Sequence, residues 1–402
     1  MPGPIRGNPP PPPPGARRAS PPPLPSGAAR PLIAPPVSHL TVSQLVKSFS
    51  LETLTKAVNI VSKDIGGLHY QRPASYLGPG GLVIHDGKID VLAVGDGHGN
   101  CARLDKLLAK VGAQLHAGQL ELLFNGDLIH PENRQNLTEM NSSLQYLKAV
   151  IALKVMYPDR VHINQGNHDI LFTNKGILEA VVDYTFRVPN PVNDYESQLP
   201  LMQHVLQRAR VTESDLRGFL GKRDLEEKEY SQGLFFLSAL CHELKAEGRT
   251  PQQVYDAVSQ YQSFMEDLPI AFVIKGSQKA AFIAHAGVVA GGVTQAEIIE
   301  GRINGTDFSL LWNYINKHYN KQDVSAMQTK LALTEDPNDT MIFGSHIRHP
   351  EVTNWFLVPY PGTNYAIFHG NVPGSYGGIL FRDAVPERFE VEVAGTAAAA
   401  AA

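Results

Sequence analysis

The sequence has few cysteines, no long uncharged apolar run and no strong excess of either charge. Only Cys101 and Cys241 occur among its 402 residues, far apart in the chain, which excludes a disulfide framework and favours a reducing, cytoplasmic location. Because no uncharged apolar run approaches ~18 residues, we expect no membrane-spanning helix. The formal net charge of -4 gives no general basis for binding nucleic acid or an anionic membrane.

Both ends of the chain differ in composition from the rest. Residues 1–40 are rich in proline, with an unbroken run at Pro9–Pro14, and we expect a disordered or polyproline II tail. A plain flexible tail, a ligand for an SH3 or WW type domain, and a segment for delivery as a secreted bacterial effector into a host cytosol are the interpretations that composition leaves open. Residues 396–402 form a low-complexity alanine tail. Residues 41–395 are then expected to form one catalytic domain.

Within that domain, apolar runs that predict strands alternate with amphipathic segments that predict helices. The predicted early strands are 89–94, 120–124 and 161–164, and the predicted early helices are 41–63, 104–111 and 144–156. Residues 190–265 are more polar and helical, which predicts a helical cap or insertion. Strand patterns return at 270–274 and 280–284, a predicted hairpin, and continue to residue 393. A mixed α/β fold with two sheets accounts for both halves.

Three short motifs each follow a predicted strand: Gly95–Gly99, Gly126–Asp127 and Gly166–Asp169. They supply carboxylate, amide and imidazole side chains, namely Asp96, Asp127, Asn167, His98 and His168. Two further imidazoles, His285 and His346, follow later strands. Such a mixture of hard oxygen and borderline nitrogen ligands suits a pair of divalent metal ions such as Mn, Fe or Zn. Any one motif alone indicates an ordinary turn, so the prediction depends on all of them occurring in order.

A pair of metal ions predicts hydrolysis of a phosphoester. The ions would clamp a phosphoryl oxygen, and a metal-bridging hydroxide would attack phosphorus directly. His168 follows Asn167 in sequence and is placed to protonate the leaving group. No serine or cysteine nucleophile is needed.

These motifs resemble those of the calcineurin-like metallophosphoesterases, and most closely those of the phosphoprotein phosphatase branch. The family patterns Gly-Asp-x-His-Gly, Gly-Asp and Gly-Asn-His-(Asp/Glu) match the three motifs above; His-(Gly/Ala)-Gly matches His285–Gly287, and Leu310–Asn313 is similar to a Leu-Leu-Trp-Ser segment. The resemblance covers residues 85–381 and implies an αββα sandwich of two mixed sheets flanked by helices. It also implies that one metal is held by Asp96, His98 and Asp127, that the other is held by Asp127, Asn167, His285 and His346, and that His168 is the acid.

The second motif departs from the family pattern Gly-Asp-x-Val-Asp-Arg-Gly. His130 stands where the family has the aspartate that orients the catalytic histidine, and Pro131 stands where it has a phosphate-binding arginine. Arg134 is the candidate replacement for that arginine. A second family arginine, before the last histidine, is also missing, and the candidate substitutes are Arg348 and Lys330. We therefore expect a complete metal site, but phosphate-binding residues that differ from those of the family.

Three functions are compatible with this pattern. The predicted one is a phosphatase that hydrolyses phosphomonoesters on phosphoproteins, at Ser/Thr or Tyr, with the helical block 190–265 shaping specificity. The alternative is a hydrolase of dinucleoside polyphosphates or other small phosphoesters, because the His285–Gly287 motif is similar to bacterial members of that type. A non-catalytic binding module is the third, and the intact ligand set argues against it.

Overall fold

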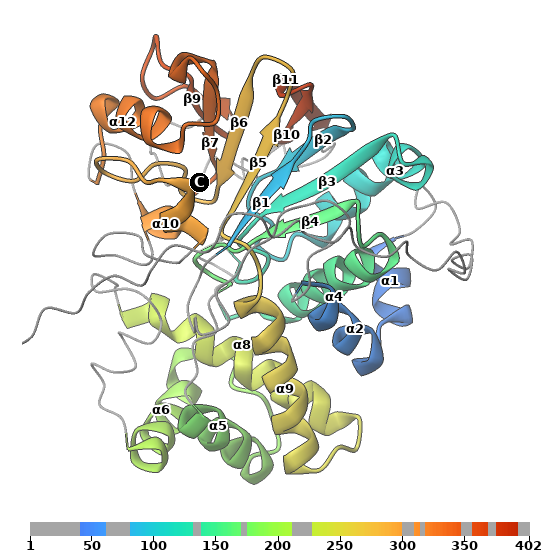
Figure 1. The fold of residues 1–402 in the computed structure, drawn as a ribbon. Coiled ribbons are helices and arrows are strands. Elements are labelled where there is room, and N and C mark those ends of the chain that lie inside the picture. Colours follow the sequence, from blue (N-terminus) through green and yellow to red (C-terminus); the bar gives the residue numbers. More distant parts are fainter. Residues whose placement is uncertain are drawn as a thin grey trace, which may run out of the picture. The chain divides into compact units, whose positions relative to one another are not determined.

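Two mixed β-sheets lie at the centre of the fold in this computed structural model (Figure 1). The first sheet has the strand order β1-β5-β6-β7-β9-β8, and the second has the order β11-β10-β2-β3-β4. The strands of the first sheet are β1 (Leu82–His85), β5 (Ala271–Lys275), β6 (Ala280–Ala284), β7 (Thr340–Gly344), β8 (Phe356–Leu357) and β9 (Tyr365–Phe368). Those of the second are β2 (Asp90–Val94), β3 (Leu120–Asn125), β4 (Val161–Asn164), β10 (Ser375–Arg382) and β11 (Val385–Glu392).

The structure describes nine segments of the chain, all within one unit, residues 35–402. These are residues 41–61, 81–131, 138–169, 175–210, 227–299, 309–313, 318–346, 356–368 and 375–392. The predictions made for the proline-rich residues 1–40 and for the alanine residues 396–402 lie outside them.

Helices cover the outer face of each sheet. Helices α3 (Cys101–Ala117) and α4 (Asn141–Met156) lie on the second sheet. The helices packed on these two and on one another are α1 (Val42–Ser48), α2 (Leu51–Val61), α5 (Lys175–Arg187), α6 (Tyr195–Ala209), α8 (Glu227–Ala246) and α9 (Pro251–Glu266), and all eight share one apolar core with that sheet (Figure 1). Those on the first sheet are α10 (Gln295–Ile299), α11 (Ser309–Trp312) and α12 (Lys321–Leu331). The predicted fold class, two mixed sheets flanked by helices, is confirmed.

Successive side chains along each strand point to opposite faces of the sheet, and this alternation produces the layers. On β2, Val91 and Ala93 face a core between the two sheets, whereas Leu92 and Val94 belong to the core beneath the helices. Side chains of a strand point alternately to its two faces, so a strand buried on both faces is apolar throughout. The continuous apolar run in the sequence therefore forms two different cores.

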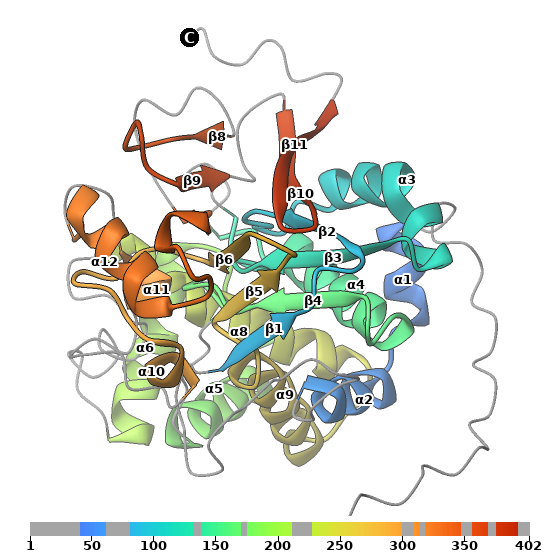
Figure 2. The ribbon, with the colours of Figure 1, turned by 45° about the horizontal axis from the view of Figure 1, so that its top comes forward.

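The strands that carry the motifs run in the same direction within each sheet. β2, β3 and β4 are parallel neighbours joined through α3 and α4, and β6 is parallel to β7. Because parallel strands end at the same sheet edge, the loops after these five strands can meet. Figure 2 shows the hairpin β10–β11 completing the second sheet beside β2.

Several elements differ from the sequence prediction. Helix α3 begins at Cys101 rather than 104, because Asn100 caps its first turn, and it continues until Gly118 adopts a left-handed conformation (φ 70°). Strand β1 and helices α5 and α12 were not predicted: β1 has only four residues, and α12 is largely polar. Helices α6 and α8 fall within block 190–265, and α9 ends one residue beyond it, at Glu266. The helical turn predicted at 216–220 lies outside the described residues. None of the described helices is long and apolar enough to cross a membrane.

Candidate metal centre

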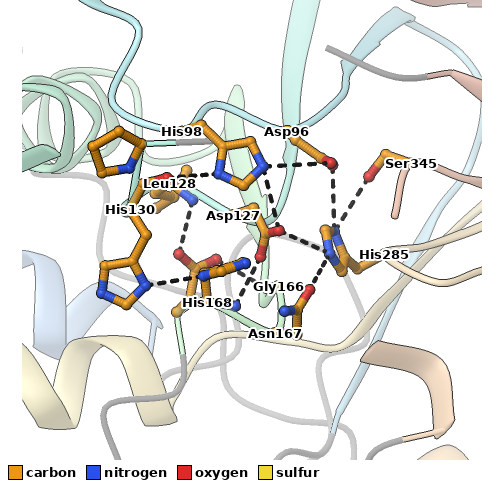
Figure 3. Close-up of polar contacts among 12 residues, drawn as sticks. Asp96, His98, Asp127, Leu128, His130, Gly166, Asn167, His168, His285 and Ser345 are labelled. Carbon is orange, nitrogen blue, oxygen red and sulfur yellow. Dashed lines mark hydrogen bonds and ion pairs between the residues drawn. The ribbon is translucent and has the colours of Figure 1, made fainter. Parts of the chain in front are cut away.

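Backbone and side-chain hydrogen bonds join the loops that follow β2, β3 and β4. The N–H groups of Gly97 and His98 both donate to the carbonyl of Asp127, at 2.9 and 2.7 Å. The N–H of His168 donates to Asp127 Oδ1 at 2.8 Å. These bonds place the three predicted motifs in one cluster, with the Asp127 loop between the other two (Figure 3).

Two glycines permit this close approach. A Cβ built on Gly166 would lie 2.1 Å from the Asp127 nitrogen, and one on Gly126 would lie 2.5 Å from Gly166 Cα. Neither distance is compatible with a side chain, so both motifs must begin with glycine. Asp169 then closes the loops by accepting from the N–H groups of Leu128 and Gly166, at 2.8 and 2.9 Å.

Asp96, His98 and Asp127 form the first group of ligand atoms. All three are buried, and their ligand atoms lie within 4.8 Å of one another. His98 Nε2 lies 3.8 Å from Asp96 Oδ2 and 3.7 Å from Asp127 Oδ2. The other ring nitrogen, Nδ1, donates to the carbonyl of His130 at 2.8 Å. Because a carbonyl can only accept, this bond leaves the Nε2 lone pair for a metal ion.

Asp127, His285 and His346 form a second group that meets the same distance limit. His285 Nε2 lies 3.2 Å from Asp127 Oδ2 and 2.8 Å from Asn167 Oδ1. Its Nδ1 donates to the carbonyl of Asn125 at 2.9 Å, which again leaves Nε2 as the coordinating nitrogen. The two groups overlap at Asp127, so the structure brings together all six predicted ligand residues.

Possible ligand atoms face one another in the second group, where a bound metal ion or a proton on His285 would compensate the oxygens. Oxygens of Asp127 and Asn167 converge with Nε2 of His285 in a buried space. Buried acceptors of this kind are costly unless a positive charge compensates them. Oxygen and imidazole nitrogen ligands suit divalent ions of the Mn, Fe and Zn type. The residues present therefore fit a two-metal centre.

The electrostatics of the same residues agree with that fit. Burial disfavours the charged imidazole of His285, but the carboxylates of Asp127 and Asp96 outweigh burial and raise its pKa to about 9. Burial also opposes ionisation of Asp127, yet His285, His168 and His98 hold its pKa well below the usual value. Burial and the Asp127 charge raise the pKa of Asp169 to about 7. The site thus favours positive charge beside an ionised Asp127.

Three non-glycine residues of the centre have left-handed backbone conformations. They are His98 (φ 43°), Asp127 (φ 51°) and His130 (φ 67°). Such conformations cost about 1–2 kcal/mol each for residues with a Cβ. Their concentration in one site is typical of a functional centre that the surrounding fold holds in place.

A buried polar layer that the sequence analysis did not identify lies beneath the ligands. Asn125 Nδ2 donates to Ser345 Oγ at 3.1 Å, and Asn125 Oδ1 accepts from Asn164 Nδ2 at 2.8 Å. Ser345 Oγ in turn donates to the Asn125 carbonyl at 3.2 Å, the same carbonyl that orients His285. These residues join the two sheets under the centre. Asn125 directly precedes Gly126, Ser345 directly precedes His346, and Asn164 is the last residue of β4. These positions next to the motifs could have identified the three residues from the sequence.

The candidates for binding phosphate are less well placed or not described. Arg134 and Arg348 lie outside the described residues. Lys330 lies in the last turn of helix α12, is exposed and donates to the carbonyl of Gly292 at 3.3 Å. Leu310 and Leu311, from the segment Leu310–Asn313, are buried in the core under the first sheet.

Two sheets packed between helices, with two overlapping groups of possible metal ligands in the loops after their strands, are compatible with a metal-dependent hydrolase. The chain belongs to the calcineurin-like phosphoesterase family, whose pattern it matches over residues 89–387. Members of this family depend on two metal ions, in agreement with the two ligand groups. A search of curated protein sequences found no match.

Three solved structures are similar to this chain at low sequence identity. One is a protein serine/threonine phosphatase from Saccharomyces cerevisiae with similarity to human phosphatase PP5 (14% identity, TM-score 0.49, 89% of this chain and 91% of that chain). A second is a candidate diadenosine tetraphosphatase (14% identity, TM-score 0.35, 80% and 100%). A third is a hypothetical protein from Pyrococcus horikoshii (12% identity, TM-score 0.37, 76% and 88%).

Proposed function

We propose that this chain is a two-metal phosphatase that hydrolyses phosphomonoesters on phosphoproteins, at Ser/Thr or Tyr. The observation that carries the proposal is the pair of buried ligand groups that share Asp127. The phosphoprotein part rests on the order of the motifs, which resembles the phosphoprotein phosphatase branch, and on the segment Leu310–Asn313.

The residues divide into those that hold metal and one that moves a proton. Asp96, His98 and Asp127 would hold one ion, and Asp127, Asn167, His285 and His346 would hold the other. When bound, the two ions supply Lewis acidity and a water of lowered pKa. His168 is partly exposed, unlike the buried ligands, and its position beside them suits transfer of a proton to the leaving oxygen. Arg134 stays our candidate for binding the phosphate.

The surrounding segments complete the proposal. Residues 41–395 would form the catalytic domain, and the helices in block 190–265 would cap it and shape specificity. Residues 1–40 would recruit a partner, with Pro9–Pro14 as the ligand of an SH3 or WW type domain. A cytoplasmic location, or action in a host cytosol after secretion, is proposed from the composition alone.

A substrate panel tests the substrate class. The full-length protein with added Mn is assayed on phosphoserine, phosphothreonine and phosphotyrosine peptides and on dinucleoside polyphosphates. We expect release of phosphate from at least one class of peptide. Turnover of the nucleotides alone would overturn the phosphoprotein assignment and favour the alternative that the His285–Gly287 motif suggests.

Substitution of the shared ligand tests the two-metal mechanism. Asp127→Asn removes a charge from both ligand groups, so we expect loss of bound metal and a fall in kcat by a factor of about 100 or more, as for other groups that stabilise developing charge. Asp256→Asn, an exposed position on α9, is the matched control and should retain both properties. Full activity in Asp127→Asn, or a wild-type protein without metal or activity, would contradict the mechanism.

A further inference from the structure

The ring of His130 lies between His168 and the helical block. Its Nδ1 is 3.0 Å from His168 Nδ1, and the two rings are nearly perpendicular at 82° (Figure 3). The same ring packs edge-on against Phe236 of α8, with 5.9 Å between centroids and 80° between planes. His130 is buried, so packing and the hydrogen bond together restrict its ring.

The backbone of His130 is held as firmly as the ring. Its N–H donates to Ser143 Oγ at 3.0 Å, and its carbonyl accepts from His98 Nδ1 at 2.8 Å. The left-handed conformation at this residue persists because these contacts hold it. One residue thus contacts a metal ligand through its backbone and the proposed acid through its ring.

We propose that His130 is a positioning residue, which orients His168 so that Nε2 of His168 meets the leaving group. The inference rests on the proposed phosphatase function and goes beyond it. The bond between the two Nδ1 atoms holds one hydrogen. For His168 to act as an acid, it must donate this hydrogen as an imidazolium to the Nδ1 lone pair of neutral His130, which leaves Nε2 as the nitrogen that gives a proton to the leaving group. An imidazole here takes the place where the family pattern has a carboxylate.

The proton transfer balances with water as the other reactant. Water supplies the oxygen that bonds to phosphorus, and the P–O bond to the leaving group breaks with its electron pair on the leaving oxygen. The proton from Nε2 of His168 then completes the alcohol. One proton of the water stays on the new phosphate hydroxyl, and the other is released to solvent and so balances the proton that His168 regains. His130 touches none of the reacting atoms in this step, and it acts only through the orientation of His168.

Helix α8 supports the same arrangement. Phe236 is fully buried against the His130 ring, and Gln232, one turn earlier, donates from Nε2 to the carbonyl of Pro131 at 3.2 Å. Two successive turns of α8 therefore hold two successive residues of the divergent motif. The helical block has a part in placing the acid as well as in covering the domain.

Leaving-group dependence tests this role. A general acid matters for phenyl phosphate, whose leaving oxygen needs a proton, and matters little for p-nitrophenyl phosphate, which leaves as a stable anion. His130→Phe retains an aromatic ring against Phe236 and removes both nitrogens, and His130→Ala removes the ring. We expect both variants to lose kcat on phenyl phosphate by about 10–100-fold, and on p-nitrophenyl phosphate by less than about 3-fold. Thermal unfolding confirms that each variant is folded.

Three further variants test whether His130 acts through His168. Adding His130→Phe to His168→Ala should cause no additional loss on phenyl phosphate, because His130 acts through His168. His130→Asn should recover most of the lost rate, since its amide occupies the place of Nδ1 and asparagine tolerates a left-handed backbone. His116→Phe removes a similar ring contact, to Tyr157 OH at 3.2 Å, in the last turn of α3, and should leave the ratio between the substrates unchanged.

The outcomes separate this inference from the function on which it rests. Equal losses on both substrates, or additive losses in the double variant, would overturn the positioning role while the phosphatase function stands. A wild-type protein inactive on every phosphomonoester would overturn the proposed function and this inference with it.

Discussion

Replacing Gly166 with alanine should disable the metal centre through a steric clash with Asp127. The added Cβ would lie 2.1 Å from the nitrogen of Asp127 and 2.4 Å from its Oδ1, where ordinary contacts begin at 3.4 Å. The Asp127 loop must therefore shift by more than about 1 Å, whereas metal sites tolerate ~0.2 Å in ligand distance. We expect a loss of about 3 kcal/mol in the free energy of unfolding, at the upper end for overpacking in a filled core.

Gly248→Ala is the control variant, because it distinguishes the effect of a steric clash from the effect of backbone strain on stability. Gly248 has φ 81° with nothing within 4 Å of an added Cβ, whereas Gly166 does not need a left-handed conformation. The control should therefore lose only about 1–2 kcal/mol from its backbone and keep its activity. The assays are urea denaturation without metal, metal content, and hydrolysis of p-nitrophenyl phosphate. Equal stability and activity in the two variants would refute the steric reasoning.

Three other predictions concern the stability of the fold. Asn125→Ala leaves buried partners in Asn164 and Ser345 without their hydrogen bonds, and should lower the free energy of unfolding by about 2–4 kcal/mol in urea denaturation. Saturating Mn should raise the free energy of unfolding by about 2.7 kcal/mol at 100 times Kd, and Asp127→Asn should abolish that rise in thermal melts. Glu121 is buried, which raises its pKa, but it accepts from Nε2 of His162 and of His85, at 2.7 and 3.2 Å, and these bonds lower the pKa from 4.5 to about 2. Its stabilising effect is thus present above pH 4.5 and is lost as the pH falls toward 2, so Glu121→Gln should flatten the pH dependence of unfolding between pH 5 and 3; an unchanged slope would contradict this.

Much of the fold could be predicted because local patterns agree with it. The apolar run 89–94 and the motif after it identify β2 and its loop, and the turn between 270–274 and 280–284 indicates the antiparallel pair β5–β6. Elements whose stability comes from distant partners were missed. Strand β1 is four residues long and pairs with β5, almost 190 residues later. Nothing local distinguishes such a segment from an apolar loop.

The candidate site was predictable where the motifs themselves contain the ligand residues. Each ligand lies directly after a strand, so its side chain and its position could be inferred together. The contacts of His130 could not be inferred, because Phe236 and Gln232 come from a helix about 100 residues away. The hydrogen bond between Asn125 and Ser345 likewise joins residues 220 positions apart.

The pairing of β10 with β2 has a consequence for synthesis of the chain. Gly378 through Phe381 pair with Val94 through Val91, so the second sheet gains its β10–β11 edge only after nearly the whole chain has been made. Until then β2 is an open edge strand, the kind of surface that pairs with other chains. Nascent or truncated chains ending before residue 375 should therefore aggregate or bind chaperones, even though Asp96, Asp127 and Asn167 have already been synthesised.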